Sequence, residues 1–142
     1  MLADAHALVR RSMRALLEAE PEFEVVAEAG DLAATIHHVA RQRPRVLVLD
    51  LGMPDGSSLR AIERLRLHVP VTDIVAATMH DIPAYARRAF DSGARGFVVK
   101  DRADSELPDA IRVTARGGWY LSPQISLQPA DPVQGDAGAP PR

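Results

Sequence analysis

The feature that most constrains the fold is a regular alternation of short apolar runs with longer stretches of helical periodicity. The clearest run, Val46–Leu49, is apolar at every position and ends at Asp50. Similar runs occupy 25–27, 74–77 and 97–99. A strand buried on both faces is apolar throughout, whereas a strand with one exposed face alternates. These runs therefore predict strands of a parallel sheet that is covered on both sides.

The stretches between the runs carry apolar residues spaced by three and four positions, which predicts amphipathic helices. The four stripes are Leu32-Ile36-Val39-Ala40, Leu59-Ile62-Leu65-Val69, Tyr85-Ala86-Ala89-Phe90 and Leu107-Ala110-Ile111-Thr114-Ala115. Residues that can accept hydrogen bonds from the first N–H groups of a helix lie near each start. These candidate caps are Asp31, Ser57 or Ser58, Asp81 and Ser105. Pro83 and Pro108 are predicted to lie in a first helical turn, where the N–H that proline lacks is not needed.

This alternation, with short links, indicates βαβ units with right-handed crossovers. We therefore predict the α/β class, with a doubly wound open parallel sheet and helices on both faces. The 142 residues suit one such domain. In sheets of this kind, functional residues gather at the carboxyl ends of the strands.

Composition narrows the class of protein further. The formal net charge of −2 gives no reason to expect a nucleic-acid or membrane partner, and the lack of cysteine excludes disulfides and a cysteine nucleophile. No apolar run approaches the roughly 20 residues of a membrane span, so we expect a cytoplasmic protein. From about Pro123, proline and glycine punctuate a stretch without periodicity. We predict one domain over 1–122 and a disordered tail over 123–142.

Four polar residues follow or end the predicted strands: Asp4, Asp50, Thr78 and Lys100. Because the carboxyl ends of parallel strands meet at one edge of a sheet, we expect these side chains to converge. A carboxylate can act as a nucleophile toward phosphorus, while a hydroxyl and an ammonium group stabilise the phosphoryl oxygens. Each residue alone is more often a helix cap, a strand former or a solvated charge. Their joint occurrence at successive strand ends favours phosphoryl chemistry.

Four segments resemble the receiver domains of NarL/FixJ-type (LuxR-like) response regulators. They are Leu2-Ala3-Asp4-Ala5-His6-Ala7-Leu8-Val9-Arg10, Val48-Leu49-Asp50-Leu51-Gly52-Met53-Pro54-Asp55-Gly56, Ala77-Thr78-Met79-His80-Asp81 and Gly93-Ala94-Arg95-Gly96-Phe97-Val98-Val99-Lys100. The resemblance runs from Met1 to about Pro123 with family-like spacing. It implies a flavodoxin-like (CheY-like) fold with five parallel strands in the order 2-1-3-4-5.

The resemblance also assigns roles to the residues. It implies that Asp50 accepts a phosphoryl group from a sensor histidine kinase, that Lys100 pairs with the phosphate, and that Thr78 hydrogen-bonds it. Phe97 would be the aromatic switch residue. Magnesium would be held by Asp4, Asp50 and the backbone carbonyl of Gly52. Such a module is not an enzyme beyond slow autodephosphorylation, and its phosphorylation alters partner contacts or homodimerisation.

The sequence departs from the family pattern in three places. Ala5 stands where the family has a second acidic residue that contacts magnesium, which predicts weakened or lost Mg²⁺ binding. Asp55 is not expected to replace it, because it lies past Pro54 on the following loop. Only three residues precede Asp4, so the first strand is predicted to be short. No helix-turn-helix sequence follows the receiver segment, so we expect no direct DNA binding by this chain. His6 is expected to have a local structural role.

Two alternative functions stay open on these residues. A pseudo-receiver would keep the fold and bind partners without phosphorylation, as Ala5 and the short first strand suggest. An aspartate-nucleophile phosphohydrolase would also place Asp50 after a strand, but it would carry a second aspartate two residues on, where this chain has Gly52. No P-loop or Gly-x-Gly-x-x-Gly motif is present, which argues against a nucleotide-dependent enzyme.

Overall fold

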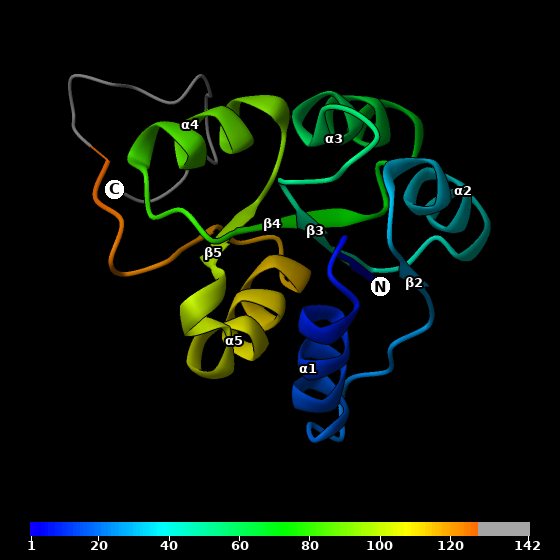
Figure 1. Ribbon diagram of the computed structural model, residues 1–142, viewed down its shortest axis with the longest axis horizontal. Helices are drawn as coiled ribbons and strands as arrows, with labels where there is room; N and C mark the ends of the chain where they lie inside the picture. Colours follow the sequence, from blue (N-terminus) through cyan, green and yellow to red (C-terminus); the bar gives the residue numbers. More distant parts are fainter. Residues whose placement is uncertain (128–142) are drawn as a thin grey trace.

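The structure, a computed structural model, describes residues 1–127 as strands in the middle of the molecule with helices on either side (Figure 1). The elements follow one another as β1 (Leu2–Ala3), α1 (Ala7–Glu18), β2 (Glu28–Ala29), α2 (Leu32–Gln42), β3 (Val46–Asp50), α3 (Ser58–His68), β4 (Asp73–Thr78), α4 (Pro83–Ser92), β5 (Gly96–Val99), the 3₁₀ turn η1 (Lys100–Arg102), α5 (Ala103–Ala115) and β6 (Tyr120–Leu121).

The strands form one parallel sheet in the order β2-β1-β3-β4-β5-β6. The predicted α/β class and the order 2-1-3-4-5 are therefore confirmed, and β1 is short, as expected, with two residues. The sixth strand was not predicted. It adds to β5 through the pairs Gly96↔Tyr120 and Phe97↔Leu121. Two residues are too few to carry a periodic signal in the sequence.

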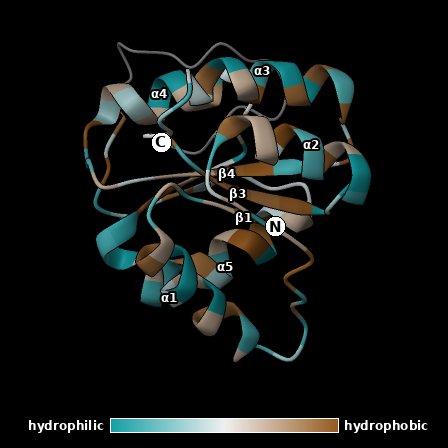
Figure 2. Cartoon of the chain, turned by 45° about the vertical axis from the view of Figure 1, so that its right-hand side comes forward, coloured by the Kyte–Doolittle hydropathy of each residue, from teal (hydrophilic) through white to brown (hydrophobic). Residues whose placement is uncertain are grey.

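Two apolar layers cover the faces of the sheet because successive strand residues point in opposite directions. Leu47 and Leu49 of β3 pack on one face with α2, α3 and α4, while Val46 and Val48 pack on the other face with α1 and α5. Figure 2 shows the central strands in brown, the colour of hydrophobic residues, between helices that carry both brown and teal segments. Burial of each such leucine or valine stabilises the fold by about 1.5–3 kcal/mol.

Two of the predicted helix caps are present. The Asp31 carboxylate accepts a hydrogen bond from the Ala34 N–H at 2.7 Å, and the Ser57 hydroxyl accepts one from the Arg60 N–H at 3.2 Å. The other two predictions are wrong. Helix α4 starts after Ile82, and Asp81 does not cap it, although Pro83 occupies the first turn as expected.

Helix α5 begins earlier than predicted. It follows η1 directly, with Arg102 at the capping position, so Ser105 lies inside the helix and Pro108 lies in its interior, not in its first turn. A 3₁₀ turn is common at the start of a helix, and here it begins the helical backbone before the serine is reached.

The strand predicted over 25–27 is misplaced. The observed strand β2 is Glu28–Ala29, and Val26 is 40% exposed although the prediction requires burial on both faces. The reason lies in β1, which has only two residues, so that on its β2 side it pairs with Glu28 and Ala29 alone. Residues 25–26 therefore have no strand beside them, and only the carbonyl of Ala27 is bonded, by the Leu2 N–H.

The packed part of the chain extends further toward the C-terminus than the sequence predicted. The predicted disordered tail starts at Pro123, whereas Ile125 and Leu127 are both buried, at 5% exposure, in the layer beside α4. The rest of that predicted tail, 128–142, lies outside the described residues. None of the helices within residues 1–127 is long and apolar enough to cross a membrane.

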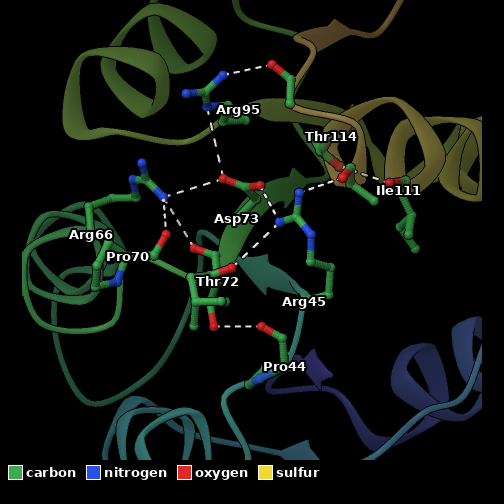
Figure 3. A network of polar contacts seen from close by, with 12 residues as sticks. Pro44, Arg45, Arg66, Pro70, Thr72, Asp73, Arg95, Ile111 and Thr114 are labelled. Carbon is green, nitrogen blue, oxygen red and sulfur yellow. Dashed lines mark hydrogen bonds and ion pairs between the residues drawn. The ribbon is translucent and has the colours of Figure 1, made fainter.

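The amino edge of the sheet is closed by a cluster of three arginines around Asp73, the first residue of β4 (Figure 3). Arg45 pairs with its carboxylate, and Arg66 and Arg95 approach it at 3.3 and 3.9 Å. Nearby, the hydroxyl of Thr72 donates to the carbonyl of Pro44 at 2.6 Å. These contacts tie the loops that enter β3, β4 and β5 to one carboxylate.

Candidate functional site

The opposite, carboxyl edge of the sheet brings together three of the predicted site residues. Asp4 follows β1, Asp50 ends β3 and Lys100 follows β5. The Lys100 ammonium nitrogen lies 2.6 Å from Asp4 Oδ2 and 3.0 Å from Asp50 Oδ1. All three side chains are at most 5% exposed. One buried cation therefore bridges two buried carboxylates, as convergence of parallel strand ends requires.

The Asp50 carboxylate is held in place by backbone groups as well as by Lys100. Its Oδ1 accepts a hydrogen bond from the Gly52 N–H at 2.9 Å, and its Oδ2 accepts a longer one from the Ala5 N–H at 3.4 Å. The Ser58 hydroxyl donates to the Asp50 carbonyl at 2.8 Å. The contacts with Gly52, Ala5 and Lys100 orient the Asp50 side chain, so that its oxygens face Lys100 and the segment after β1.

Thr78 and Phe97 lie near this group but not in it. Thr78 ends β4, and its hydroxyl accepts a hydrogen bond from the His80 N–H at 3.2 Å. Within residues 1–127, no hydrogen bond joins Thr78 to Asp50 or Lys100. The threonine instead lines a cavity of about 240 Å³ together with Gly52, His80 and Arg88. Phe97 is fully buried within β5.

A cation could be held by a different set of donors from the one expected. Asp4, His6 and Asp50 each offer one ligand atom, and these atoms lie within 4.8 Å of one another. The two carboxylates fit a hard divalent cation such as Mg²⁺, which prefers oxygen ligands. The Ala5 side chain offers no ligand atom, and the third side-chain donor is an imidazole. The residues thus fit a divalent cation, with one oxygen fewer than the family pattern supplies.

The sequence predicted a local structural role for His6, and the structure places its ring beside Asp4. His6 sits at the capping position of α1, but its side chain makes no capping hydrogen bond. Its ring Nδ1 lies 3.6 Å from Asp4 Oδ1, and the side chain is 73% exposed. The Asp-x-His spacing was the available signal. It carried little weight because the distance between the two side chains depends on the turn from β1 into α1.

Asp55, which was not expected to join the metal site, has another role. Its carboxylate oxygens accept hydrogen bonds from the Leu32 N–H at 2.7 Å and from the Ala33 N–H at 3.1 Å. These bonds, led by the one from Leu32, hold the pKa of Asp55 below its ordinary value. The loop after β3 thereby caps the start of α2, and both oxygens of the Asp55 carboxylate are engaged with the N–H groups of this helix.

Comparisons with known proteins agree with one another. The family model of the response regulator receiver domain matches residues 1–112. The nitrate/nitrite response regulator protein NarP of Escherichia coli is 37% identical over 126 residues, which are 89% of this chain and 59% of NarP. The chain spans between 53% and 63% of the length of such curated relatives.

Solved structures give the same result. A LuxR-family response regulator from Aurantimonas sp. SI85-9A1 superposes with a TM-score of 0.84 at 35% identity, covering 88% of this chain and 89% of that one. The isolated REC domain of RcsB from Salmonella enterica, solved with the phosphomimetic BeF₃⁻, superposes with a TM-score of 0.80 at 29% identity, covering 87% and 92%.

Proposed function

Because this chain belongs to the response regulator receiver domain family, whose members are signalling modules and not classical enzymes, we propose that it accepts a phosphoryl group on Asp50. The donor would be the phosphohistidine of a sensor histidine kinase in the cytoplasm. The observation that carries the proposal is the Lys100 ammonium bridging Asp50 and Asp4 at the carboxyl edge of the sheet. An ammonium at 3.0 Å from the nucleophilic carboxylate is placed to offset the charge of an added phosphoryl group.

The transfer follows from the groups around Asp50. A carboxylate oxygen attacks phosphorus, the bond from phosphorus to the donor nitrogen breaks, and the imidazole keeps the electron pair and takes a proton. Lys100 and the Gly52 N–H are the positive groups nearest to the Asp50 carboxylate. A divalent cation held by Asp4, Asp50 and the Gly52 carbonyl would add charge neutralisation when bound. Slow hydrolysis of the acyl phosphate would return the carboxylate.

Thr78 and Phe97 supply the conformational response. The Thr78 hydroxyl is one strand away from Asp50 and lines the adjacent cavity, so it can turn to donate to a phosphoryl oxygen. That movement would change the packing around the neighbouring strand β5, where Phe97 pairs opposite Ala76. A modification that adds charge at a strand end thus biases a packed element between two arrangements. The readout would be a change in homodimerisation or partner binding, with DNA contacted by a separate domain of the regulator.

A pseudo-receiver is the second candidate, and Ala5 is the observation that favours it. The side chain at this position supplies no oxygen, and Asp55 cannot replace it because it caps α2. A cation bound by fewer carboxylates binds more weakly, which would slow or stop the transfer. The chain would then act by binding partners through the same fold.

Intact mass spectrometry after incubation with acetyl phosphate separates the two candidates. We expect a Mg²⁺-dependent phosphoryl adduct on the wild type and none on Asp50→Asn, because the amide cannot act as the nucleophile. An adduct that persists on Asp50→Asn would place the acceptor elsewhere. A folded wild type that takes up no phosphoryl group, with or without Mg²⁺, would leave the pseudo-receiver as the function.

A further inference from the structure

In both Asp4 and Asp50, one carboxylate oxygen contacts Lys100 and the other accepts a backbone hydrogen bond. Asp4 Oδ2 and Asp50 Oδ1 face Lys100 at 2.6 and 3.0 Å. The other oxygens face the segment after β1: Asp4 Oδ1 accepts from the His6 N–H at 2.8 Å, and Asp50 Oδ2 from the Ala5 N–H at 3.4 Å. The side away from Lys100 is therefore the one where acceptor oxygens meet the His6 ring.

The His6 imidazole is available at that place. It does not cap α1, it is mostly exposed, and its Nδ1 lies within 3.6 Å of Asp4 Oδ1. Together with Asp4 and Asp50 it forms a group whose ligand atoms all lie within 4.8 Å of one another. The ring is 73% exposed, so its rotation about the side-chain bonds is little restricted by packing.

We propose that Asp4, His6 and Asp50 form a mixed nitrogen and oxygen site that selects a first-row transition-metal cation over Mg²⁺. The inference deepens the proposed function and rests on it, because Asp50 is also the proposed phosphoryl acceptor. Imidazole is a good ligand for Zn²⁺, Ni²⁺ and Cu²⁺, whereas Mg²⁺ prefers oxygen and gives up water reluctantly. Ala5 leaves the site without one hard oxygen donor, while the imidazole of His6 stays beside Asp4 as a borderline donor.

Isothermal titration calorimetry tests the site with Zn²⁺ and Mg²⁺ as probes and needs no phosphoryl donor. The wild type is expected to bind Zn²⁺ at least about tenfold more tightly than Mg²⁺. Loss of even an outer partner of a metal site weakens binding about 10- to 100-fold, so His6→Ala should weaken Zn²⁺ binding by no less than about tenfold. The same change should leave Mg²⁺ binding within about twofold, because oxygen ligands dominate there.

Two further variants make the assignment specific. Ala5→Asp restores an oxygen donor, so it should tighten Mg²⁺ binding and reduce the ratio between the two cations. His68→Ala is the matched control, since His68 is an exposed histidine at the far end of α3. It should bind Zn²⁺ as the wild type does. In NMR spectra, Zn²⁺ should shift the ring resonances of His6 before those of the other histidines.

Specific outcomes would overturn the inference. They are equal Zn²⁺ affinities of His6→Ala and wild type, or Zn²⁺ binding that survives Asp50→Asn unchanged. Failure of the proposed function is a separate result. Phosphorylation could be absent from the mass spectra while Zn²⁺ binding still depends on His6, which would remove the proposed function and keep the metal site.

Discussion

Each of the two edges of the sheet carries a cluster of acidic and basic side chains, but acids are in excess at one edge and bases at the other. At the carboxyl edge, two carboxylates share one ammonium group, so the charges of Asp4, Asp50 and Lys100 add to −1. At the amino edge, one carboxylate is shared by three guanidinium groups, and Asp73 with its arginines adds to +2. Both clusters join segments from several strands, but the surplus charge is negative at the carboxyl edge and positive at the amino edge.

The surplus charge is handled differently at each edge. Around Asp73, the spare guanidinium donors bond to backbone carbonyls: Arg45 to Ala115, Arg66 to Thr72 and Arg95 to Gly117. This cluster is closed and holds loops together. At the carboxyl edge the surplus consists of carboxylate oxygens, which a cation or a phosphoryl group with its cation can use. Excess carboxylate oxygens suit a site that takes up a cation, whereas guanidinium groups bonded to loop carbonyls suit a structural role.

The largest effect is expected from Lys100→Met. It leaves two buried carboxylates without their shared cation, which should lower the free energy of unfolding by about 3–5 kcal/mol. The phosphoryl adduct should also disappear, because no group offsets the added charge. Urea denaturation and intact mass measure the two results. Lys100→Arg keeps the charge and should recover most of the stability without recovering full phosphorylation. Unchanged stability of Lys100→Met would contradict the bridging role.

Asp73→Ala should have a smaller effect, and it should lower stability without changing phosphorylation. Its three arginines are partly exposed and keep their carbonyl partners, so we expect a loss of about 1–3 kcal/mol in the free energy of unfolding. Phosphorylation should stay at the wild-type level, because the cluster lies at the other edge of the sheet. Urea denaturation beside the acetyl phosphate assay checks both parts. A selective loss of the adduct would show that the two edges are coupled.

Asp55→Ala should have the smallest effect, and it shows whether position at the carboxyl edge alone makes a carboxylate functional. Hydrogen bonds from α2, first that of Leu32, hold the folded-state pKa of Asp55 below its ordinary value of 3.8. A lowered pKa stabilises the fold above the ordinary value, and this stabilisation is lost as pH falls through the folded-state pKa.

Wild type and Asp55→Ala should therefore differ in denaturation midpoint near neutral pH and converge in acid, as the pH falls through the folded-state pKa of Asp55. Asp81→Ala is the control, since Asp81 is an exposed aspartate that caps no helix. It should match the wild type at both pH values. A difference that persists undiminished in acid would exclude charge-dependent capping as the cause.

Much of the site followed from the sequence because its members stand at strand ends. Val46–Leu49 is recognisable as a buried strand, and parallel pairing sends Asp50 and Lys100 to the same edge whatever the loops do. His6 did not follow, because its distance from Asp4 is set by the turn into α1. The capping roles of Asp81 and Ser105 failed because α4 and α5 start after Ile82 and Arg102, without a side-chain cap, and tertiary packing decides where each helix begins.

By itself, the sequence determined the class of fold and the meeting of Asp4, Asp50 and Lys100, because local periodicity and strand direction suffice for these. The strand order came from the resemblance of its motifs to a known family. Tertiary structure alone decided which groups pair across the chain. It placed the Asp55 carboxylate at the start of α2, surrounded Asp73 with arginines, added β6, buried Ile125 and left residues 25–26 without a partner strand. Such contacts join residues far apart in sequence, so they depend on how the finished layers pack and not on any local pattern.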